Sequence, residues 1–229
     1  GFWRASDVLE FTSHGYGGYV WDENMKKHVF EGYRVNEIAN YGIEFINNYD
    51  SEKPFFMTIS HIEPHHQNDH KHYEGPDGSK ERFGDYELPK DLKLLGGGNA
   101  REEYPDYLGC CKSLDDNLGR VIDLLKKKGI YENTVIIYSS DHGSHFHTRN
   151  RDKNKNGFDD YKRSCHSACL RIPMIISGGA FKGGKVVREL VSNCSIPKTI
   201  MNIAGVEAQD GMIGEDLAGL INGADSNRK

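Results

Sequence analysis

The feature that most constrains this chain is a short apolar run that ends in an Asp-His pair, within TVIIYSSDHGSHFH at residues 134–147. The run is rich in β-branched residues and favours a buried strand of a parallel sheet, although so short a run also fits a buried helix. Asp141 and His142 follow it directly, and Gly143 lets the backbone turn. Because ligands of open α/β sheets bind beyond the carboxyl ends of strands, this pair is a candidate functional site. The alternative is a polar loop in which Asp141 caps the next helix.

A second apolar run, PFFMTIS at residues 54–60, repeats this arrangement. It also predicts a buried parallel strand, and histidines follow its carboxyl end. Nine of the eleven histidines fall in three places, at residues 61–72, 142–147 and 166. Their grouping after strand ends favours a polar functional site over isolated structural histidines.

Helices and strands alternate along the rest of the sequence. Apolar residues recur at helical spacing at about residues 32–49, 107–128 and 196–204, which predicts three amphipathic helices. Residues 172–177 form a third apolar run that is typical of a strand. This alternation predicts an α/β fold with a mainly parallel sheet flanked by helices.

The segments between these elements predict loops. Residues 1–30 are rich in glycine and aromatic residues, and we expect little regular structure there. The polar segment at 67–100 predicts a long loop of the kind that often binds substrate. Residues 186–191 predict a short strand or the start of a helix, and the tail from Gly211 is polar.

Length and charge narrow the class of protein. The 229 residues are enough to bury the core of one domain or of two small ones, and we expect a single α/β domain over residues 1–229. No apolar run approaches the roughly 18 residues of a membrane span. The formal net charge of −5 gives no overall preference for nucleic acid. Basic residues cluster locally at Arg149, Arg151, Lys153, Lys155, Lys162 and Arg163.

The five cysteines do not indicate a disulfide-stapled scaffold, because their number is odd and their spacing forms no framework. Cys165 and Cys169 flank His166 and leave two interpretations open, zinc ligands or packed thiols. Since a matching second pair of ligands is missing from the sequence, packed thiols are favoured.

Five short motifs together resemble those of the sulfatases of the alkaline phosphatase-like superfamily. The resemblance covers roughly residues 14–221 and rests on the shared order and spacing of the motifs. The motifs are a strand followed by Pro64-His65, LDDNLGR at Leu114–Arg120, a strand ending in Ser140-Asp141-His142-Gly143, Lys162 nine residues before Arg171-Ile172-Pro173, and IPKTIMNIAGV at residues 196–206.

This resemblance implies hydrolysis of sulfate esters. The stretches KRSCHSACLRIP and EPHHQND are most similar to sulfatases that act on sulfated polysaccharides, so the implied substrate is a sulfated oligo- or polysaccharide. A periplasmic or extracellular location is implied by the same similarity, and neither a nucleic-acid partner nor a membrane span is expected.

The resemblance also implies roles for individual residues. Asp141 and His142 would be ligands of a divalent cation, usually calcium in this family, which acts as a Lewis acid on the sulfate. His65 would contact the sulfate or protonate the leaving oxygen, and Lys162 would bind a sulfate oxygen and offset charge in the transition state. Position alone makes four more residues candidates for sugar or sulfate binding: His66, Gln67, His145 and His166.

Two parts of the family pattern are missing from this sequence. The family's nucleophile is a formylglycine made from Cys or Ser in a Cys/Ser-x-Pro/Ala-x-Arg motif, and no cysteine or serine here has that context. The family's early pair of aspartate metal ligands is missing too. We therefore expect this chain to be the C-terminal part of a sulfatase domain, with the formylglycine in an N-terminal part upstream.

Two alternative functions stay open. The chain could belong to a phosphodiester or phosphonate hydrolase of the same superfamily, which a comparison of aryl sulfates with aryl phosphates would separate. It could also be a non-catalytic module that binds anionic glycans, and an upstream nucleophile motif would exclude that alternative.

Overall fold

The structure, a computed structural model, describes residues 1–95, 98–148 and 161–221. Four of the predicted basic residues lie outside the described residues, namely Arg149, Arg151, Lys153 and Lys155.

The chain divides into two compact units, and each is built from two separate stretches of sequence. The first unit comprises Gly1–Lys128 and His145–Arg163, and the second comprises Gly129–Ser144 and Ser164–Lys229. The expectation that residues 1–229 form one domain stays a prediction.

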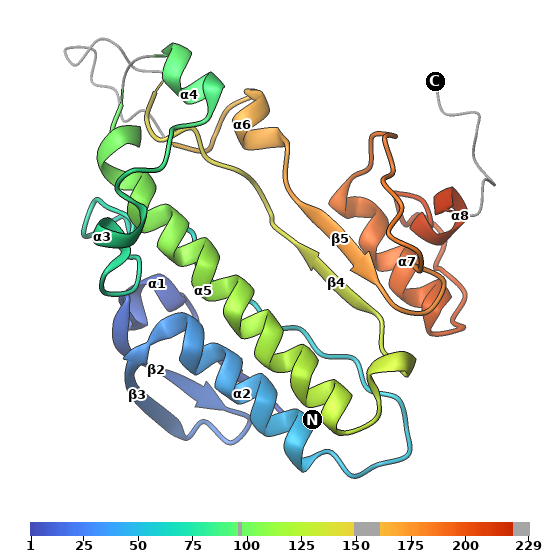
Figure 1. Ribbon diagram of the computed structural model, residues 1–229. Helices are drawn as coiled ribbons and strands as arrows, with labels where there is room; N and C mark the ends of the chain where they lie inside the picture. The colour runs from blue at the N-terminus through green and yellow to red at the C-terminus, as the bar shows by residue number, and fades with distance from the viewer. Residues whose placement is uncertain (96–97, 149–160, 222–229) are drawn as a thin grey trace. The chain divides into compact units, whose positions relative to one another are not determined.

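The first unit begins with a three-stranded antiparallel sheet, where the sequence predicted loops. The strands are β1 (Arg4–Ala5), β2 (Tyr16–Asp22) and β3 (Lys27–Tyr33), in the order β1-β2-β3. Figure 1 labels β2 and β3. Asp22 closes the β2–β3 turn, because its Oδ1 accepts hydrogen bonds of 2.9 Å from the backbone N–H groups of Asn24 and Lys26. Gly17 and Gly18 have positive φ and shift the register of β2, which obscured the strand in the sequence pattern.

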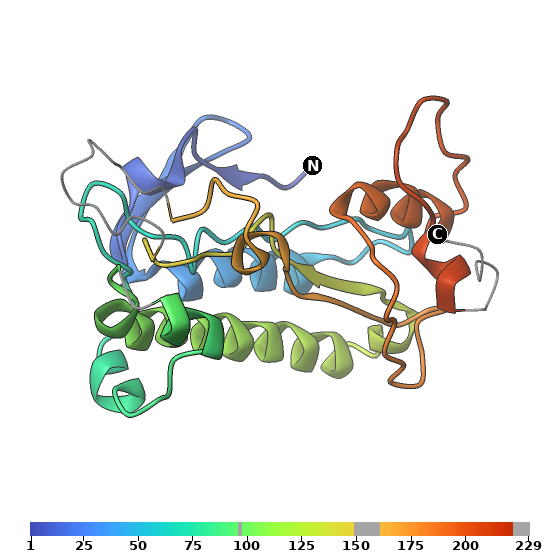
Figure 2. The same ribbon diagram turned by 90° about the horizontal axis from the view of Figure 1, so that it is seen from above.

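Two long helices form the body of the first unit. α2 (Arg34–Asn48) and α5 (Ala100–Lys127) lie side by side in both views (Figures 1 and 2). Val35 of α2 and Leu114 of α5 share a core cluster with Tyr33, which confirms the apolar faces that the sequence predicted. α2 matches its predicted range closely.

α5 begins earlier than predicted, at Ala100, although Pro105 removes one N–H from its ladder. The early turns are held by tertiary packing, since Ala100 is buried in a cluster with Tyr73, Leu92 and Phe146. The other end follows the prediction, because Gly129 takes a left-handed φ of 72° just beyond it.

Among the described residues, the first unit also contains three short helices. α1 (Leu9–Thr12) precedes β2, while α3 (Ser79–Phe83) and α4 (Lys90–Leu95) lie within the segment that was predicted to be a loop. α3 packs against α5. The predicted loop at 67–100 is therefore partly helical.

The run at residues 54–60 has no strand assignment, contrary to the prediction. Its side chains alternate between half-buried and exposed, as they would in a strand. One face packs on α2, where Ile59 and Met57 lie over Gly42, whereas Phe56 is 72% exposed. A strand is defined by its hydrogen-bonded neighbour, and no described segment pairs with this one.

The second unit contains a two-stranded sheet and helices around a small core. Its strands are β4 (Ile136–Ser139) and β5 (Met174–Ser177), which fall on two of the predicted apolar runs. Figure 1 shows them as a pair, and they run antiparallel, so the expected parallel arrangement does not hold between these two. The helical elements are η1 (Tyr131–Asn133), α6 (Ser167–Leu170), η2 (Asn193–Ser195), α7 (Ile196–Ile203) and α8 (Leu217–Ile221).

Two of these helices test the sequence predictions directly. α7 confirms the predicted helix at 196–204, with Pro197 in its first turn. α8 lies in the tail predicted to be merely polar, because Leu217 and Ala218 are buried against Phe181. Residues 186–191 form no regular element, so that prediction was wrong.

The chain combines helices with short strands, as the predicted α/β class requires. Among the described residues, no helix combines the length and the apolar character that crossing a lipid bilayer requires.

Candidate active site

The loop that carries His65 is anchored by a buried ion pair. Arg34, the first residue of α2, donates from Nε to Glu63 Oε1 at 2.8 Å, and both side chains are only 2% exposed. Arg34 Nη1 also donates to the backbone oxygen of Ser13 at 2.9 Å. Burial raises the pKa of the Glu63 carboxyl, and the Arg34 guanidinium opposes this rise. Because Glu63 lies two residues before His65, the start of α2 fixes this loop.

His65 and Lys162 meet within the first unit. Lys162 Nζ lies 2.7 Å from His65 Nε2, and the Tyr161 hydroxyl lies 2.8 Å from the same nitrogen. The rings of His65 and Tyr161 are nearly perpendicular, with centroids 5.6 Å apart. The Lys162 ammonium and the Tyr161 hydroxyl therefore both converge on His65 Nε2.

The contact with Lys162 assigns the protonation of the His65 ring. An ammonium group only donates hydrogen bonds, so Nε2 must accept, and the ring proton of the neutral imidazole is then on Nδ1. An anionic oxygen placed at this point would take the hydrogen bond of Lys162. It would also favour a proton on Nε2, which could then donate to the anion.

Aromatic packing holds the Tyr161-Lys162 segment in place. Tyr161 is 4% exposed, and its ring lies 5.0 Å from that of His66 and 5.5 Å from that of His147. His66 also packs edge-on against Tyr73 at 5.3 Å. Burial and then the nearby His147 lower the pKa of His66 and so disfavour the charged form of its ring. His66 thus packs against Tyr161, the residue whose hydroxyl contacts His65.

Gln67 and His145, two of the predicted substrate-binding residues, are buried in the first unit. Gln67 is 1% exposed, and its Nε2 donates to the backbone oxygen of Glu10 at 2.8 Å and to Asp69 Oδ1 at 2.7 Å. His145 is 0% exposed, and its backbone N–H donates to the backbone carbonyl oxygen of Tyr161 at 2.9 Å. Both positions favour a structural role, and direct contact with a substrate stays a prediction.

Asp141 and His142 lie beyond the end of β4, in the second unit. The Asp141 side chain is 83% exposed, and its Oδ2 lies 3.4 Å from His142 Nε2. Asp141 Oδ1 accepts from the backbone N–H of His142 at 2.9 Å. His142 Nδ1 lies 2.9 Å from the Gly143 carbonyl oxygen, which only accepts, so Nδ1 carries the ring proton and Nε2 faces Asp141.

These two side chains fit part of a cation site. A backbone carbonyl that holds Nδ1–H leaves the lone pair on Nε2, which is the usual arrangement of a metal-binding histidine. A carboxylate oxygen suits calcium, whereas an imidazole nitrogen suits softer divalent ions better. Asp141 and His142 therefore supply one hard and one borderline ligand, which is fewer than a complete site needs.

Gly143 allows the loop after Asp141 to pack closely. A Cβ atom at this position would lie 2.0 Å from the backbone oxygen of Ala168, and the Gly143 N–H donates to the Cys169 oxygen at 2.8 Å. Close approach of two backbones, and not an unusual φ, is thus the reason for glycine here.

His166 is the N-cap residue of α6 in the second unit and is exposed. Its backbone oxygen accepts from the N–H groups of Cys169 and Leu170. Cys169 is buried and Cys165 is exposed, and all five cysteines are free thiols. The buried Cys169 fits the packed-thiol interpretation, whereas the exposed Cys165 does not. Among the described residues, the side chains that converge with metal-ligand spacing lie elsewhere.

The structure thus brings His65 and Lys162 together in one unit and Asp141 and His142 together in the other. Sequence reasoning missed Tyr161, whose hydroxyl reaches His65, and the Arg34–Glu63 pair that anchors the loop. The only signal for Tyr161 was its position next to Lys162.

Comparison with known proteins defines the class first. The fold matches that of a solved sulfatase, yidJ of Bacteroides fragilis, with a TM-score of 0.78 at 21% identity, over 97% of this chain and 48% of that one. The two proteins therefore share an α/β fold, which confirms the predicted class. The model of the Sulfatase family matches residues 3–206, so the chain belongs to the sulfatase family.

Two curated relatives extend the comparison. The N-acetylglucosamine-6-O-sulfatase of Bacteroides thetaiotaomicron is 33% identical over 126 residues, which cover 55% of this chain and 21% of that protein. The ulvan-active sulfatase of Formosa agariphila is 24% identical over 98% of this chain and 42% of its own length. The chain therefore spans less than half the length of these relatives.

Proposed function

We propose that this chain is the sulfate-binding part of a sulfatase, and that the full-length protein hydrolyses sulfate esters of a sulfated oligo- or polysaccharide. The observation that carries the proposal is the 2.7 Å contact of Lys162 Nζ with His65 Nε2, in a chain of the sulfatase family. An ammonium and an imidazole that meet at one point can both bind a single sulfate oxygen.

Each residue then has a distinct task in the reaction. Lys162 binds a sulfate oxygen and offsets the negative charge that grows in the transition state. His65 donates a proton to the oxygen that leaves with the sugar as the S–O bond breaks, and water ultimately supplies the oxygen that stays on the released sulfate. The Tyr161 ring, which packs nearly perpendicular to that of His65 with centroids 5.6 Å apart, orients the imidazole for this transfer.

Asp141 and His142 would hold a divalent cation, with calcium as the family's usual ion. Bound there, the cation would act as a Lewis acid on the sulfate. The nucleophile would be a formylglycine in the N-terminal part of the protein. Support for this division comes from the lengths of the relatives, of which this chain spans 21% and 42%.

Support for a carbohydrate substrate comes from the relatives named for N-acetylglucosamine and for ulvan. A periplasmic or extracellular location follows from a polysaccharide substrate, because a large polyanion does not cross a membrane intact.

The test is an assay of the full-length protein for release of inorganic sulfate from sulfated oligosaccharides, with aryl sulfate and aryl phosphate compared in parallel. We expect cation-dependent release of sulfate and a preference for the aryl sulfate. Faster hydrolysis of the phosphate would favour a phosphoester or phosphonate hydrolase. Binding of the glycan without release of sulfate would indicate a non-catalytic module.

A further inference from the structure

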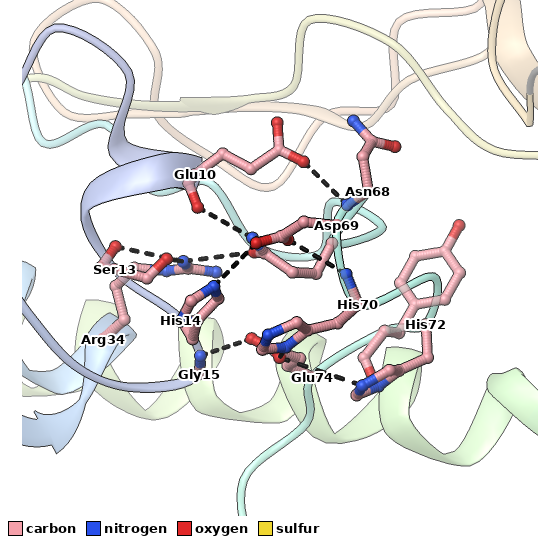
Figure 3. A network of polar contacts seen from close by, with 12 residues as sticks. Glu10, Ser13, His14, Gly15, Arg34, Asn68, Asp69, His70, His72 and Glu74 are labelled. Atoms are coloured by element: carbon pink, nitrogen blue, oxygen red, sulfur yellow. Dashed lines mark hydrogen bonds and ion pairs between the residues drawn. The ribbon is translucent and has the colours of Figure 1, made fainter.

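A cluster of histidine and carboxylate side chains lies in the first unit, apart from the residues assigned to sulfate hydrolysis. His14 comes from the turn between α1 and β2, while Asp69, His70, His72 and Glu74 come from the loop that follows Gln67 (Figure 3). His14 Nε2 lies 2.9 Å from Asp69 Oδ2, although 55 positions separate the two residues. The rings of His14 and His70 stack with centroids 4.0 Å apart.

The ligand atoms of this cluster converge. One donor atom each from His14, Asp69 and His70 lie within 4.8 Å of one another, and the same holds for His70, His72 and Glu74. A tetrahedral zinc ion with bonds of about 2.0–2.2 Å places its ligands about 3.3 Å apart. A metal lies in the plane of each imidazole that binds it, so one of the two stacked rings must turn before the first group can hold the ion. Asp69 and His70 are both exposed, which leaves room for this rearrangement.

Neighbouring groups already orient these side chains as they do around bound metal ions. Glu74 Oε1 accepts a hydrogen bond from His70 Nδ1, so the lone pair of a neutral His70 is on Nε2. The buried Gln67 Nε2 donates to Asp69 Oδ1 at 2.7 Å, which leaves Oδ2 directed at His14. Glu74 thus holds Nδ1 of His70 and Gln67 holds Oδ1 of Asp69, which leaves His70 Nε2 and Asp69 Oδ2 to bind a metal.

The backbone of the loop is fixed as well. Gln67 N donates to His72 O at 2.9 Å, and Lys71 N donates to Gln67 O at 2.7 Å, which closes a tight turn. The Gly15 N–H donates to Glu74 Oε2, so the segment after α1 is tied to this turn. The positions of His14, Asp69 and His70 thus depend on defined backbone contacts.

We propose that His14, Asp69 and His70 bind one Zn²⁺ ion, with water as the fourth ligand and with Glu74 and Gln67 as orienting partners. Two imidazole nitrogens and one carboxylate oxygen form a donor set that zinc accepts readily, whereas calcium prefers oxygen alone. The ion links the segment before β2 to the loop that begins just after His65 and His66. Its role is to stabilise that loop.

The test is titration of the metal-free protein with ZnCl₂ by calorimetry, together with Co²⁺ absorption as a probe of tetrahedral coordination. We expect one site with a Kd in the micromolar range or below, and a rise in Tm of about 5 °C at a hundredfold excess over Kd. The variants His14→Ala and Asp69→Asn should each weaken binding at least tenfold and abolish the Co²⁺ bands. Asp69→Asn keeps the shape of the side chain, so circular dichroism can show that it folds.

Two further variants serve as controls. His28→Ala removes a similar pair, in which His28 Nε2 lies 2.8 Å from Asp22 Oδ2, and it should leave zinc binding unchanged. Asp141→Asn should do the same, which separates this site from the cation expected for sulfate hydrolysis. Absence of saturable binding to the wild-type protein, or equal affinity in the His14→Ala and Asp69→Asn variants, would overturn the proposal without affecting the proposed function.

Discussion

Lys162 Nζ lies 2.7 Å from His65 Nε2, although 97 positions separate the two residues in the sequence. The contact forms because Arg34 holds Glu63, just before His65, and because Tyr161 packs among aromatic rings, just before Lys162. The loop that carries His65 is therefore fixed two residues before it, at Glu63, and the segment that carries Lys162 is fixed one residue before it, at Tyr161.

Replacing Lys162 by methionine should lower turnover of sulfate esters by the full-length protein by about 10²–10³-fold, because the transition state loses a charged hydrogen-bond donor. The measurement is kcat for release of sulfate from a sulfated oligosaccharide. The matched control is Lys112→Met on α5, since Lys112 pairs with Asp116 on the helix surface. Turnover of Lys162→Met within threefold of the wild type would contradict the assigned role.

Breaking the buried ion pair should be costly. Arg34→Met leaves the Glu63 carboxyl buried without its cation, and we expect a loss of about 3–5 kcal/mol in the free energy of unfolding, measured with urea. The double variant Arg34→Met/Glu63→Leu should recover much of this loss because neither charge remains. Lys93→Met is the control, since it removes an exposed pair with Glu87 and should cost less than about 1 kcal/mol.

Because of His61, we expect the free energy of unfolding to decrease as the pH falls. Burial lowers the pKa of its ring to about 4, and its Nδ1 has no hydrogen-bond partner among the described residues. Between pH 6.5 and 4 the unfolded chain binds a proton that the folded chain excludes, so stability decreases as pH falls through this window. We expect a loss of about 2 kcal/mol by pH 4, allowing for the part of the ring that solvent reaches.

The measurement is urea unfolding at several pH values, with His61→Phe as the comparison. If His61 is responsible, the variant loses this part of the pH dependence while the wild type keeps it. Identical pH profiles for the two proteins would exclude His61 as the cause.

Substitution of Gly143 should disturb the loop that carries Asp141 and His142. A Cβ atom would lie 2.0 Å from the backbone oxygen of Ala168, so we expect Gly143→Ala to cost about 1–3 kcal/mol in the free energy of unfolding. Gly119→Ala is the matched control: a Cβ there meets nothing within 4 Å, and alanine should stabilise α5 by about 0.5–1 kcal/mol. Equal effects of the two substitutions would show that the close approach is unimportant.

Local pattern was sufficient for the elements whose apolar faces are regular. α2, α7 and the C-terminal end of α5 follow their predicted ranges, because helical periodicity and terminal signals are properties of neighbouring residues. β4 and β5 also fall on predicted apolar runs. The predictions failed where glycines interrupt the alternation, in β2, and where burial by distant residues stabilises a helix, as at Ala100.

The candidate site divides in the same way. The sequence by itself determined the family and named the candidate site residues, because short motifs keep their order and spacing along one chain. Only the tertiary structure decided that Tyr161 reaches His65, that Gln67 is buried, and that His14 meets Asp69. The reason is physical: hydrogen bonds between residues far apart in sequence depend on how loops are anchored and packed, and no local pattern of residues records that.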